Sequence, residues 1–342
     1  MPQDVKAQEE RCNNLNTYLF NLIVYSPVKE RSQYFYSLVE HIVDHFPSRI
    51  LFIEGTSDEQ QELATEYHGV QQGEGCEQIT FKVPQDQRDK ISFVILPHLL
   101  SDLPVVSLWG QDPTTEQDVL PHLIKFSSRL IFDSDSADNL QRFSHRILAL
   151  ADASLVDLVD LNWARVKGWR DAFDEVFDSP ARLEQLSLAK KITITYNGCK
   201  NQYQRCSAIQ ALYLQAWLAA QLGWKARHLE PGDPITKIVY FNGVHDLQLE
   251  LVANEAKELP SGSILGIEIE GGHDQSFSLR QAPGMPQAIV HISSLEACEL
   301  PFNVMISGPR LRYQFLKDLM YGRSSQHYLG TLHLLSQQDW KR

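Results

Sequence analysis

The sequence predicts an α/β N-terminal domain with a mostly parallel sheet flanked by helices, followed by an α+β domain with an antiparallel meander. In the first half, short apolar strand patterns alternate with single amphipathic helix patterns, which is typical of a parallel sheet covered on both faces. In the second half, successive short strands are separated by turn residues, as in a meander. A length of 342 residues fits about two domains.

The first strand is expected at Thr17–Tyr25, a run rich in β-branched and aromatic residues that ends at Ser26-Pro27. A helix follows over Glu30–Phe46, because its apolar residues fall on one helical face and Phe46-Pro47 stops it. The later elements of this half are strands at Ile50–Ile53, Gln78–Val83, Val105–Trp109 and Leu130–Phe132, and helices at Gln87–Leu100, Glu116–Phe126 and Ala137–Ala149.

One segment of the first half is ambiguous. Glu62–His68 fits either a helix or a strand. Two strands around the Gly-rich turn Gln72–Gly75 would make a hairpin with Gln78–Val83. The predicted sheet therefore has about five or six strands.

The second half begins after a helical region, Leu155–Ala189, that we interpret as a connector. A strand at Ile192–Tyr196 and a long helix at Tyr203–Leu222 follow, and Gly223 stands where a helix C-cap glycine is expected. The meander strands are Lys237–Phe241, Asp246–Val252, Ile264–Glu270, Phe277–Arg280 and Ala288–Ile292, and two helices follow near Leu311–Leu319 and Ser325–Leu335. The expected domains are residues 1–153 and 191–342, joined by residues 154–190.

Charge and composition exclude several classes of function. The formal charge of −12 argues against a general nucleic-acid or anionic-membrane binder, because both need a basic footprint. No apolar run reaches the roughly 18 residues of a membrane span, and the polar start MPQDVKAQEER does not fit a secretory signal. Five scattered cysteines favour a reducing cytoplasm over a disulfide framework.

Enzyme signatures are missing from the sequence. It contains neither a G-x-G-x-x-G turn nor a phosphate-binding G-x-x-x-x-G-K-[ST] loop, and the first strand ends instead at Ser26-Pro27-Val28. There is no G-x-S-x-G nucleophile elbow. We therefore expect no catalytic residues, no cofactor and no metal.

Three motifs resemble sites but fit simpler explanations. His41 and His45 stand four apart on a helix, as zinc ligands do, yet on the flank of its apolar face, where solvated histidines are expected. Cys199 and Cys206 lack an accompanying Cys-x-x-Cys pair, which favours plain thiols. Gly271-Gly272-His273-Asp274 lies between two strands, where we expect the glycines to supply the positive φ of a tight turn.

Asp133 is the best-placed single carboxylate. It follows the strand Leu130–Phe132, and ligands of parallel sheets bind at the carboxyl ends of strands. It could equally cap the next helix. As an alternative function, an α/β enzyme could act on a phosphorylated sugar or nucleotide at this edge, with Asp133 as acid or base and Arg129 or Lys125 as an anion contact.

The tryptophans suggest a second hypothesis, that of a partner interface. Trp109 ends a strand beside a turn, and Trp163 and Trp169 share a helical segment with Arg165 and Arg170. Trp and Arg are enriched at interface hot spots, so these five residues are candidates for a partner interface. Core packing is the alternative, since Trp is buried on average.

Several segments together resemble the glucose-6-phosphate dehydrogenase assembly protein family, often called OpcA. The matching stretches are Leu19–Tyr25, Pro47–Ile50, Cys76–Thr80, Leu96-Pro97, Asp102–Val105, Trp109, Arg129–Ser134, Asp160–Arg165, Trp169-Arg170 and Ala216–Trp224. Relatives often carry paired cysteines before the Glu-Gln and a doubled tryptophan, whereas this chain has only Cys76 and has Leu108 before Trp109.

The resemblance implies a non-enzymatic role. Proteins of that family bind glucose-6-phosphate dehydrogenase, promote its assembly into active oligomers and so support the oxidative pentose phosphate pathway and NADPH production. The missing second cysteine puts in doubt any cysteine-based redox regulation carried over from the family. The expected partner is therefore that dehydrogenase, with neither nucleic acid nor membrane as a partner.

Overall fold

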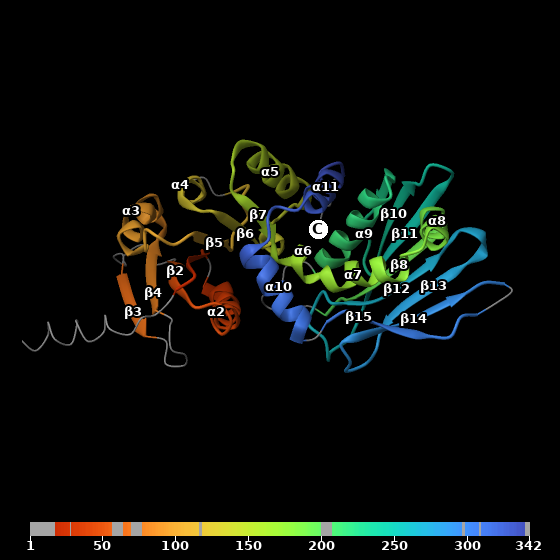
Figure 1. The fold of residues 1–342 in the computed structure, drawn as a ribbon. Coiled ribbons are helices and arrows are strands. Elements are labelled where there is room, and N and C mark those ends of the chain that lie inside the picture. Colours follow the sequence, from red (N-terminus) through yellow and green to blue (C-terminus); the bar gives the residue numbers. More distant parts are fainter. Residues whose placement is uncertain are drawn as a thin grey trace, which may run out of the picture. The chain divides into compact units, whose positions relative to one another are not determined.

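Figure 1 shows the computed structural model of the chain, which describes residues 18–27, 29–56, 64–69, 77–115, 118–199, 207–295, 298–307 and 309–338. Its contacts divide the chain into two compact units, Met1–Gly110 with Asp118–Leu130, and Gln111–Gln117 with Ile131–Arg342. The division into domains 1–153 and 191–342 with a connector at 154–190 stays a prediction.

The first unit contains a mostly parallel sheet, as predicted. Its strands are β1 (Phe20–Ser26), β2 (Ser48–Thr56), β3 (Ala64–Gly69), β4 (Glu77–Pro84) and β5 (Val105–Trp109), in the order β3-β4-β2-β1-β5. Four of them run parallel, and only the edge strand β3 pairs antiparallel, with β4. The hairpin alternative for Glu62–His68 is thus confirmed, whereas its turn at Gln72–Gly75 lies outside the described residues.

Helices pack on this sheet. Helix α2 (Lys29–Val43) lies against β1 and β2 and buries Phe35, Val39 and Ile42, the predicted apolar face. The predicted helix Gln87–Leu100 is divided into η1 (Gln85–Lys90), α3 (Ile91–Ile95) and η2 (Leu96–His98), and Pro97 stands in the first turn of η2. Helix α4 (Leu120–Phe126) begins later than the predicted Glu116–Phe126 helix, because Asp118 and Val119 are described and form a bend.

The continuous part of the second unit begins within β6 (Arg129–Phe132), and this unit contains most of the helices. They are η3 (Ser134–Ser136), α5 (Leu140–Ala153), α6 (Leu161–Arg165), α7 (Lys167–Val176), α8 (Pro180–Ser187), α9 (Ile209–Gln221), α10 (Pro309–Tyr321) and α11 (Gln326–Leu335). The prediction of a purely helical segment at Leu155–Ala189 was wrong, because it includes strand β7 (Asp157–Asp160). Four residues are too few for a strand period to appear in the sequence.

An eight-stranded, predominantly antiparallel sheet forms the rest of this unit (Figure 1). The strands are β8 (Lys191–Asn197), β9 (Lys225–Glu230), β10 (Ile235–Phe241), β11 (Asp246–Asn254), β12 (Ile264–Glu270), β13 (Ser276–Gln281), β14 (Gln287–Ser293) and β15 (Phe302–Met305). A short 3-10 helix, η4 (Gly272–Asp274), lies in the turn between β12 and β13. Their order is β15-β14-β13-β12-β8-β11-β10-β9.

The meander is interrupted at its centre, which the sequence did not predict. Strand β8 lies between β11 and β12, parallel to the first and antiparallel to the second. In this position in the middle of the sheet, its side chains Ile192 and Ile194 are fully buried. Helix α9 packs on β8 and β11, and Gly223 adopts φ +66° after it, so the predicted C-cap glycine is confirmed.

Candidate functional site: a charged and aromatic cavity near two buried aspartates

The carboxyl ends of β1, β2 and β5 are tightly packed in the first unit. The rings of Tyr25 and Trp109 stack with centroids 4.3 Å apart, and Trp109 is fully buried. A Cβ added at Gly55 would lie 2.5 Å from the carbonyl oxygen of Pro27. Open α/β sheets bind ligands at this edge. In this chain, a stacked aromatic pair and a close backbone contact lie there instead.

Two carboxylates, Asp133 and Asp160, are buried together in the second unit. Asp160 Oδ1 accepts hydrogen bonds from the backbone N–H groups of Asn162 (2.7 Å) and Trp163 (3.0 Å) and thereby caps α6. Asp133 Oδ1 accepts from the backbone N–H of Asp135 and from Asn162 Nδ2 (3.1 Å). The structure therefore places Asp133 at the N-cap of the short turn η3, whereas the predicted next helix, α5, is capped by Asn139.

The burial of this pair shifts the protonation of Asp160. Burial, together with the neighbouring Asp133, raises the pKa of Asp160 to about 7, although the hydrogen bonds from Trp163 and Ser134 act in the opposite direction. Burial likewise raises the pKa of Tyr213, which packs beside Tyr328 with ring centroids 6.3 Å apart. Burial beside a second carboxylate thus favours the protonated form of Asp160.

A cavity of about 450 Å³ opens beside this cluster, entirely within the second unit. Its walls come from β7, α6, α7, α9, α10 and α11 and from the segment between α10 and α11. Most of its lining side chains are aromatic or ionisable: Trp163, Lys167, Arg170, Asp171, Asp174, Trp217, Phe315, Asp318, Arg323, His327 and Tyr328.

Arg170 is held rigidly in the cavity wall. Its guanidinium carbon lies 3.6 Å from the centroid of the Trp163 ring, and its Nη1 donates a hydrogen bond of 2.6 Å to the Trp163 carbonyl. Burial lowers the pKa of Arg170 to about 10, although Asp171, Asp174 and Asp318 act in the opposite direction. Trp163 and Arg170 can make this contact because they are seven residues apart, on either side of the junction between α6 and α7.

The structure brings only two of the predicted interface residues together, Trp163 and Arg170. Trp163 and Trp169 are buried, so their side chains follow the core-packing alternative, as Trp109 does. Arg165 Nη1 donates to Asn162 Oδ1 (2.9 Å). The assignment of these residues to a partner interface stays a prediction.

The remaining predicted motifs have local explanations. His41 and His45 are exposed, and their Nδ1 atoms face backbone carbonyls one turn earlier. The turn prediction for Gly271–Asp274 was wrong in its mechanism, because the positive φ angles belong to His273 and Asp274. The glycines are needed for space instead, since a Cβ on Gly272 would meet Leu188 at 2.9 Å. Cys206, like Cys12 and Cys76, lies outside the described residues, whereas Cys199 is half-buried.

The sequence reasoning missed Asp160 and the acidic wall of the cavity. Asp160 precedes Leu161-Asn162-Trp163, a pattern that is typical of an N-cap and could have identified it. Asp174 and Asp318 are separated by more than a hundred residues, so no local pattern joins them. Among the described residues, no cluster of three metal-ligating side chains and no helix long and apolar enough to cross a membrane occurs.

Two family models match this chain in succession. Residues 39–149 match the model described as glucose-6-phosphate dehydrogenase subunit N-terminal domain, and residues 156–300 match the corresponding C-terminal domain. A protein of Nostoc punctiforme named OxPP cycle protein OpcA is 27% identical over 56% of this chain and 40% of its own length. The Synechocystis protein of the same name is 28% identical over 44% of this chain and 30% of its own length. The matched stretch thus spans less than half of either relative.

Solved structures share the fold over almost the whole chain. The 3-ketoreductase KijD10 of Actinomadura kijaniata, solved with TDP-benzene and NADP, gives a TM-score of 0.55 at 8% identity, covering 93% of this chain and 94% of its own. The UDP-N-acetylglucosamine 3-dehydrogenase GnnA of Acidithiobacillus ferrooxidans gives 0.54 at 9% identity, covering 94% and 96%. At such identities the likeness is one of fold alone.

Proposed function

The chain belongs to the OpcA family of glucose-6-phosphate dehydrogenase subunits, and from this premise we propose that it is a non-catalytic assembly factor and allosteric activator. It binds glucose-6-phosphate dehydrogenase, promotes the active oligomer of that enzyme and thereby supports the oxidative pentose phosphate pathway in the cytoplasm. The observation that carries the proposal is the consecutive match to both family domains, over residues 39–149 and 156–300.

The packing of the first sheet supports a role as scaffold. Related folds occur in NADP-bound oxidoreductases, yet here the strand-end edge holds the Tyr25–Trp109 stack and the Gly55–Pro27 contact. The phosphate-loop glycines are also missing after β1. Both features favour a nucleotide-binding fold that now serves protein–protein contact.

The enzyme alternative at Asp133 receives less support. Both Asp133 and Arg129 are buried, and Asp133 Oδ1 already accepts two hydrogen bonds from this chain. Lys125, the other proposed anion contact, is exposed. A general acid or base needs to reach its substrate within hydrogen-bond distance, so these positions favour a structural role for Asp133.

Activation by this route needs little free energy. An activator that binds the active oligomer more tightly than the inactive form shifts the population toward activity. A tenfold activation needs about 1.4 kcal/mol of differential binding free energy. An interface of standard size, roughly 1,600 Å² in total, is sufficient for that difference.

Exposed apolar side chains indicate where contact with the partner could occur. Phe93 (74% exposed) and Leu96 (47%) are three residues apart in α3 and η2 of the first unit, and Leu295 and Leu300 are exposed between β14 and β15 of the second. Adjacent exposed apolar residues mark interaction surfaces more often than single ones do. We therefore propose these residues, rather than the buried tryptophans, as the first positions to test.

The test mixes the purified chain with glucose-6-phosphate dehydrogenase from the same organism. We expect a higher initial rate and a larger particle mass by light scattering at micromolar concentrations. The double variant Phe93→Ser with Leu96→Ser should fold normally and activate less, whereas Leu155→Ser, also at a fully exposed leucine, serves as the matched control. Unchanged rate and mass with the wild-type chain would contradict the proposal.

A further inference from the structure

The cavity of the second unit contains an arginine, Arg170, with carboxylates nearby in the wall but no direct ion pair to any of them among the described residues. Arg170 donates one hydrogen bond, to the Trp163 carbonyl, and stacks on the Trp163 ring. No described carboxylate lies within ion-pair distance of it. A guanidinium has five N–H donors, so four of them remain for a ligand.

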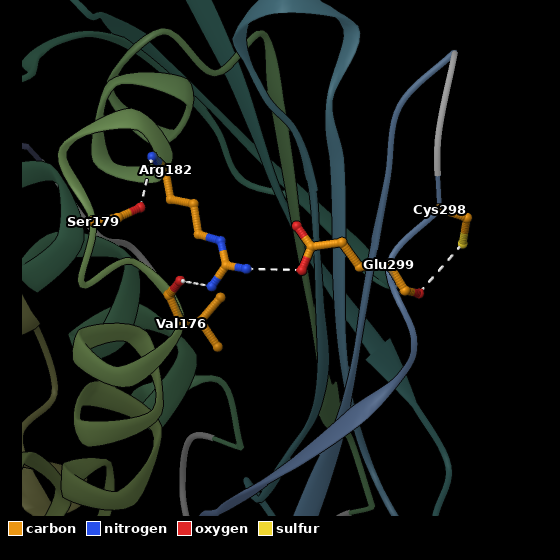
Figure 2. A network of polar contacts seen from close by, with 5 residues as sticks. All are labelled: Val176, Ser179, Arg182, Cys298 and Glu299. Carbon is orange, nitrogen blue, oxygen red and sulfur yellow. Dashed lines mark hydrogen bonds and ion pairs between the residues drawn. The ribbon is translucent and has the colours of Figure 1, made fainter.

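Arg182 is an arginine of the same unit that does have a carboxylate partner. Its Nη1 donates to the Val176 carbonyl at 3.3 Å, and its Nη2 pairs with Glu299 Oε2 at 2.8 Å (Figure 2). Both arginines thus donate to one backbone carbonyl, but only Arg182 has a carboxylate from this chain. The N–H groups of Arg170 that donate no hydrogen bond to the described residues are therefore available to an anionic group in the cavity.

The other cavity walls provide different chemistry. Asp171 is already paired with Lys167 Nζ at 2.9 Å. Asp174 and Asp318 line the cavity without an ion pair among the described residues. Carboxylates accept hydrogen bonds from hydroxyl groups, and the rings of Trp217 and Tyr328 offer flat apolar surface beside them.

The volume of the cavity and the charges in its wall indicate which class of ligand it fits. A volume of about 450 Å³ falls within the roughly 300–1,000 Å³ of small-molecule pockets, which is more than one side chain of a protein partner would fill. The charges of Lys167, Arg170 and Arg323 balance those of Asp171, Asp174 and Asp318. A simple anion would contact only the cationic side chains and bind weakly, whereas a molecule with one anionic end and several hydroxyl groups can also donate hydrogen bonds to the carboxylates.

We infer that this cavity binds a small hydroxylated metabolite with one anionic group, of the size of a monosaccharide phosphate or sugar acid. Arg170 binds the anionic group, with Arg323 and His327 as further donors in the wall, and Asp174 and Asp318 accept hydrogen bonds from the hydroxyl groups. The inference does not depend on the proposed function, because it concerns binding to the chain alone.

Isothermal titration of the full chain with four probes tests the inference. We expect glucose 6-phosphate to bind, gluconate or inorganic phosphate to bind more weakly, and glucose to show no binding up to roughly 10 mM. The comparison between glucose 6-phosphate and gluconate distinguishes a phosphate from a carboxylate as the preferred anion. If gluconate binds more tightly, the ligand is a sugar acid and the site assignment holds.

Matched variants locate the binding site. Arg170→Gln should weaken glucose 6-phosphate binding about tenfold or more, since hydrogen bonds to charged groups contribute about 1.5–3 kcal/mol. Arg323→Gln, at an exposed position, should weaken it severalfold, and Asp174→Asn should weaken the sugar phosphate but not inorganic phosphate. Arg182→Gln makes the same charge change outside the cavity and should leave binding unchanged.

Two results would overturn the inference. One is the absence of binding by the wild-type chain for both glucose 6-phosphate and gluconate. The other is binding that Arg323→Gln and Asp174→Asn leave unchanged, which decides the question even if Arg170→Gln fails to fold. Because the dehydrogenase is absent from these titrations, their failure is separate from a failure of the assembly role.

Discussion

Ser134 donates two hydrogen bonds to Asp160, from its backbone N–H to Oδ2 at 2.8 Å and from its hydroxyl to Oδ1 at 3.0 Å. The contact links the turn after β6 to the start of α6, which are 26 residues apart in the sequence. Together with the two bonds that cap α6, it gives the buried Asp160 four donors. The stability of this region should therefore depend strongly on Asp160.

We predict that Asp160→Ala lowers the free energy of unfolding by about 3 kcal/mol. The substitution removes the N-cap of α6 and leaves buried donors without an acceptor, and each of those effects costs roughly 1–2 kcal/mol. Urea unfolding measures the change. Asp152→Ala, at an exposed position of α5, should change stability by less than about 0.5 kcal/mol, and equal effects of the two variants would refute the predicted role.

The raised pKa of Asp160 predicts a pH dependence of stability. The unfolded chain releases this proton near the ordinary pKa of 3.8, whereas the folded chain holds it up to about 7. Between those values the folded state binds more protons, so the contribution of Asp160 to stability falls as pH rises.

Asp160→Asn should remove that slope, because an amide does not titrate. We expect the wild-type chain to lose stability relative to Asp160→Asn as pH rises from about 5 to about 7.5, and the difference to level off above that. Urea unfolding at several pH values gives both curves. Curves that stay parallel across this range would show that Asp160 is not the titrating group.

Trp109 should act on stability rather than on partner binding. Trp109→Phe keeps an aromatic ring against Tyr25 but leaves unfilled volume in a fully buried site, at a cost on the order of 2 kcal/mol. Under conditions where the variant stays folded, its affinity for the dehydrogenase should equal that of the wild type. A large loss of affinity in the folded variant would favour the interface hypothesis for Trp109.

Two helical glycines should respond to alanine in opposite directions. A Cβ on Gly168 in α7 would overlap the backbone carbonyl oxygen of Ile306. A backbone atom cannot move aside as the end of a side chain can. Gly330 in α11 has nothing within 4 Å of an added Cβ.

Gly168→Ala should therefore lower the melting temperature, with a cost of at least about 2 kcal/mol. Gly330→Ala should raise it, with a gain of about 0.5–1 kcal/mol, because alanine favours the helix more than glycine does. Thermal unfolding followed by circular dichroism measures both. Effects of the same sign would mean that the contact between Gly168 and Ile306 is not as close as described.

Local pattern was sufficient for most elements of the fold. The alternation of strands and single helices predicted the parallel sheet of the first unit, and the apolar face of α2 follows Phe35, Val39 and Ile42 as expected. Gly223 shows its predicted positive φ. These features depend on a few neighbouring residues, whose periodicity or backbone preference is visible in the chain itself.

Pairing between distant segments was less predictable. The five consecutive strand patterns of the second half indicated a meander, but nothing local shows that the earlier strand β8 separates β11 from β12. The sequence marks the tryptophans as candidates for a partner interface, yet tryptophan is equally compatible with a position in the core. Only the packing around them places Trp109 against Tyr25 and Trp163 beneath Arg170.

The amino-acid order thus accounts for the two fold classes, for the absence of a phosphate loop after β1 and for the resemblance to the OpcA family. The tertiary structure decided that Asp133 and Asp160 share one buried site, that Gly271 and Gly272 are required for space, and that Arg170 faces a cavity without a direct ion pair among the described residues. The physical reason is that burial, charge pairing and steric contact depend on distances in space. Those distances join residues such as Asp174 and Asp318, which no sequence window contains together.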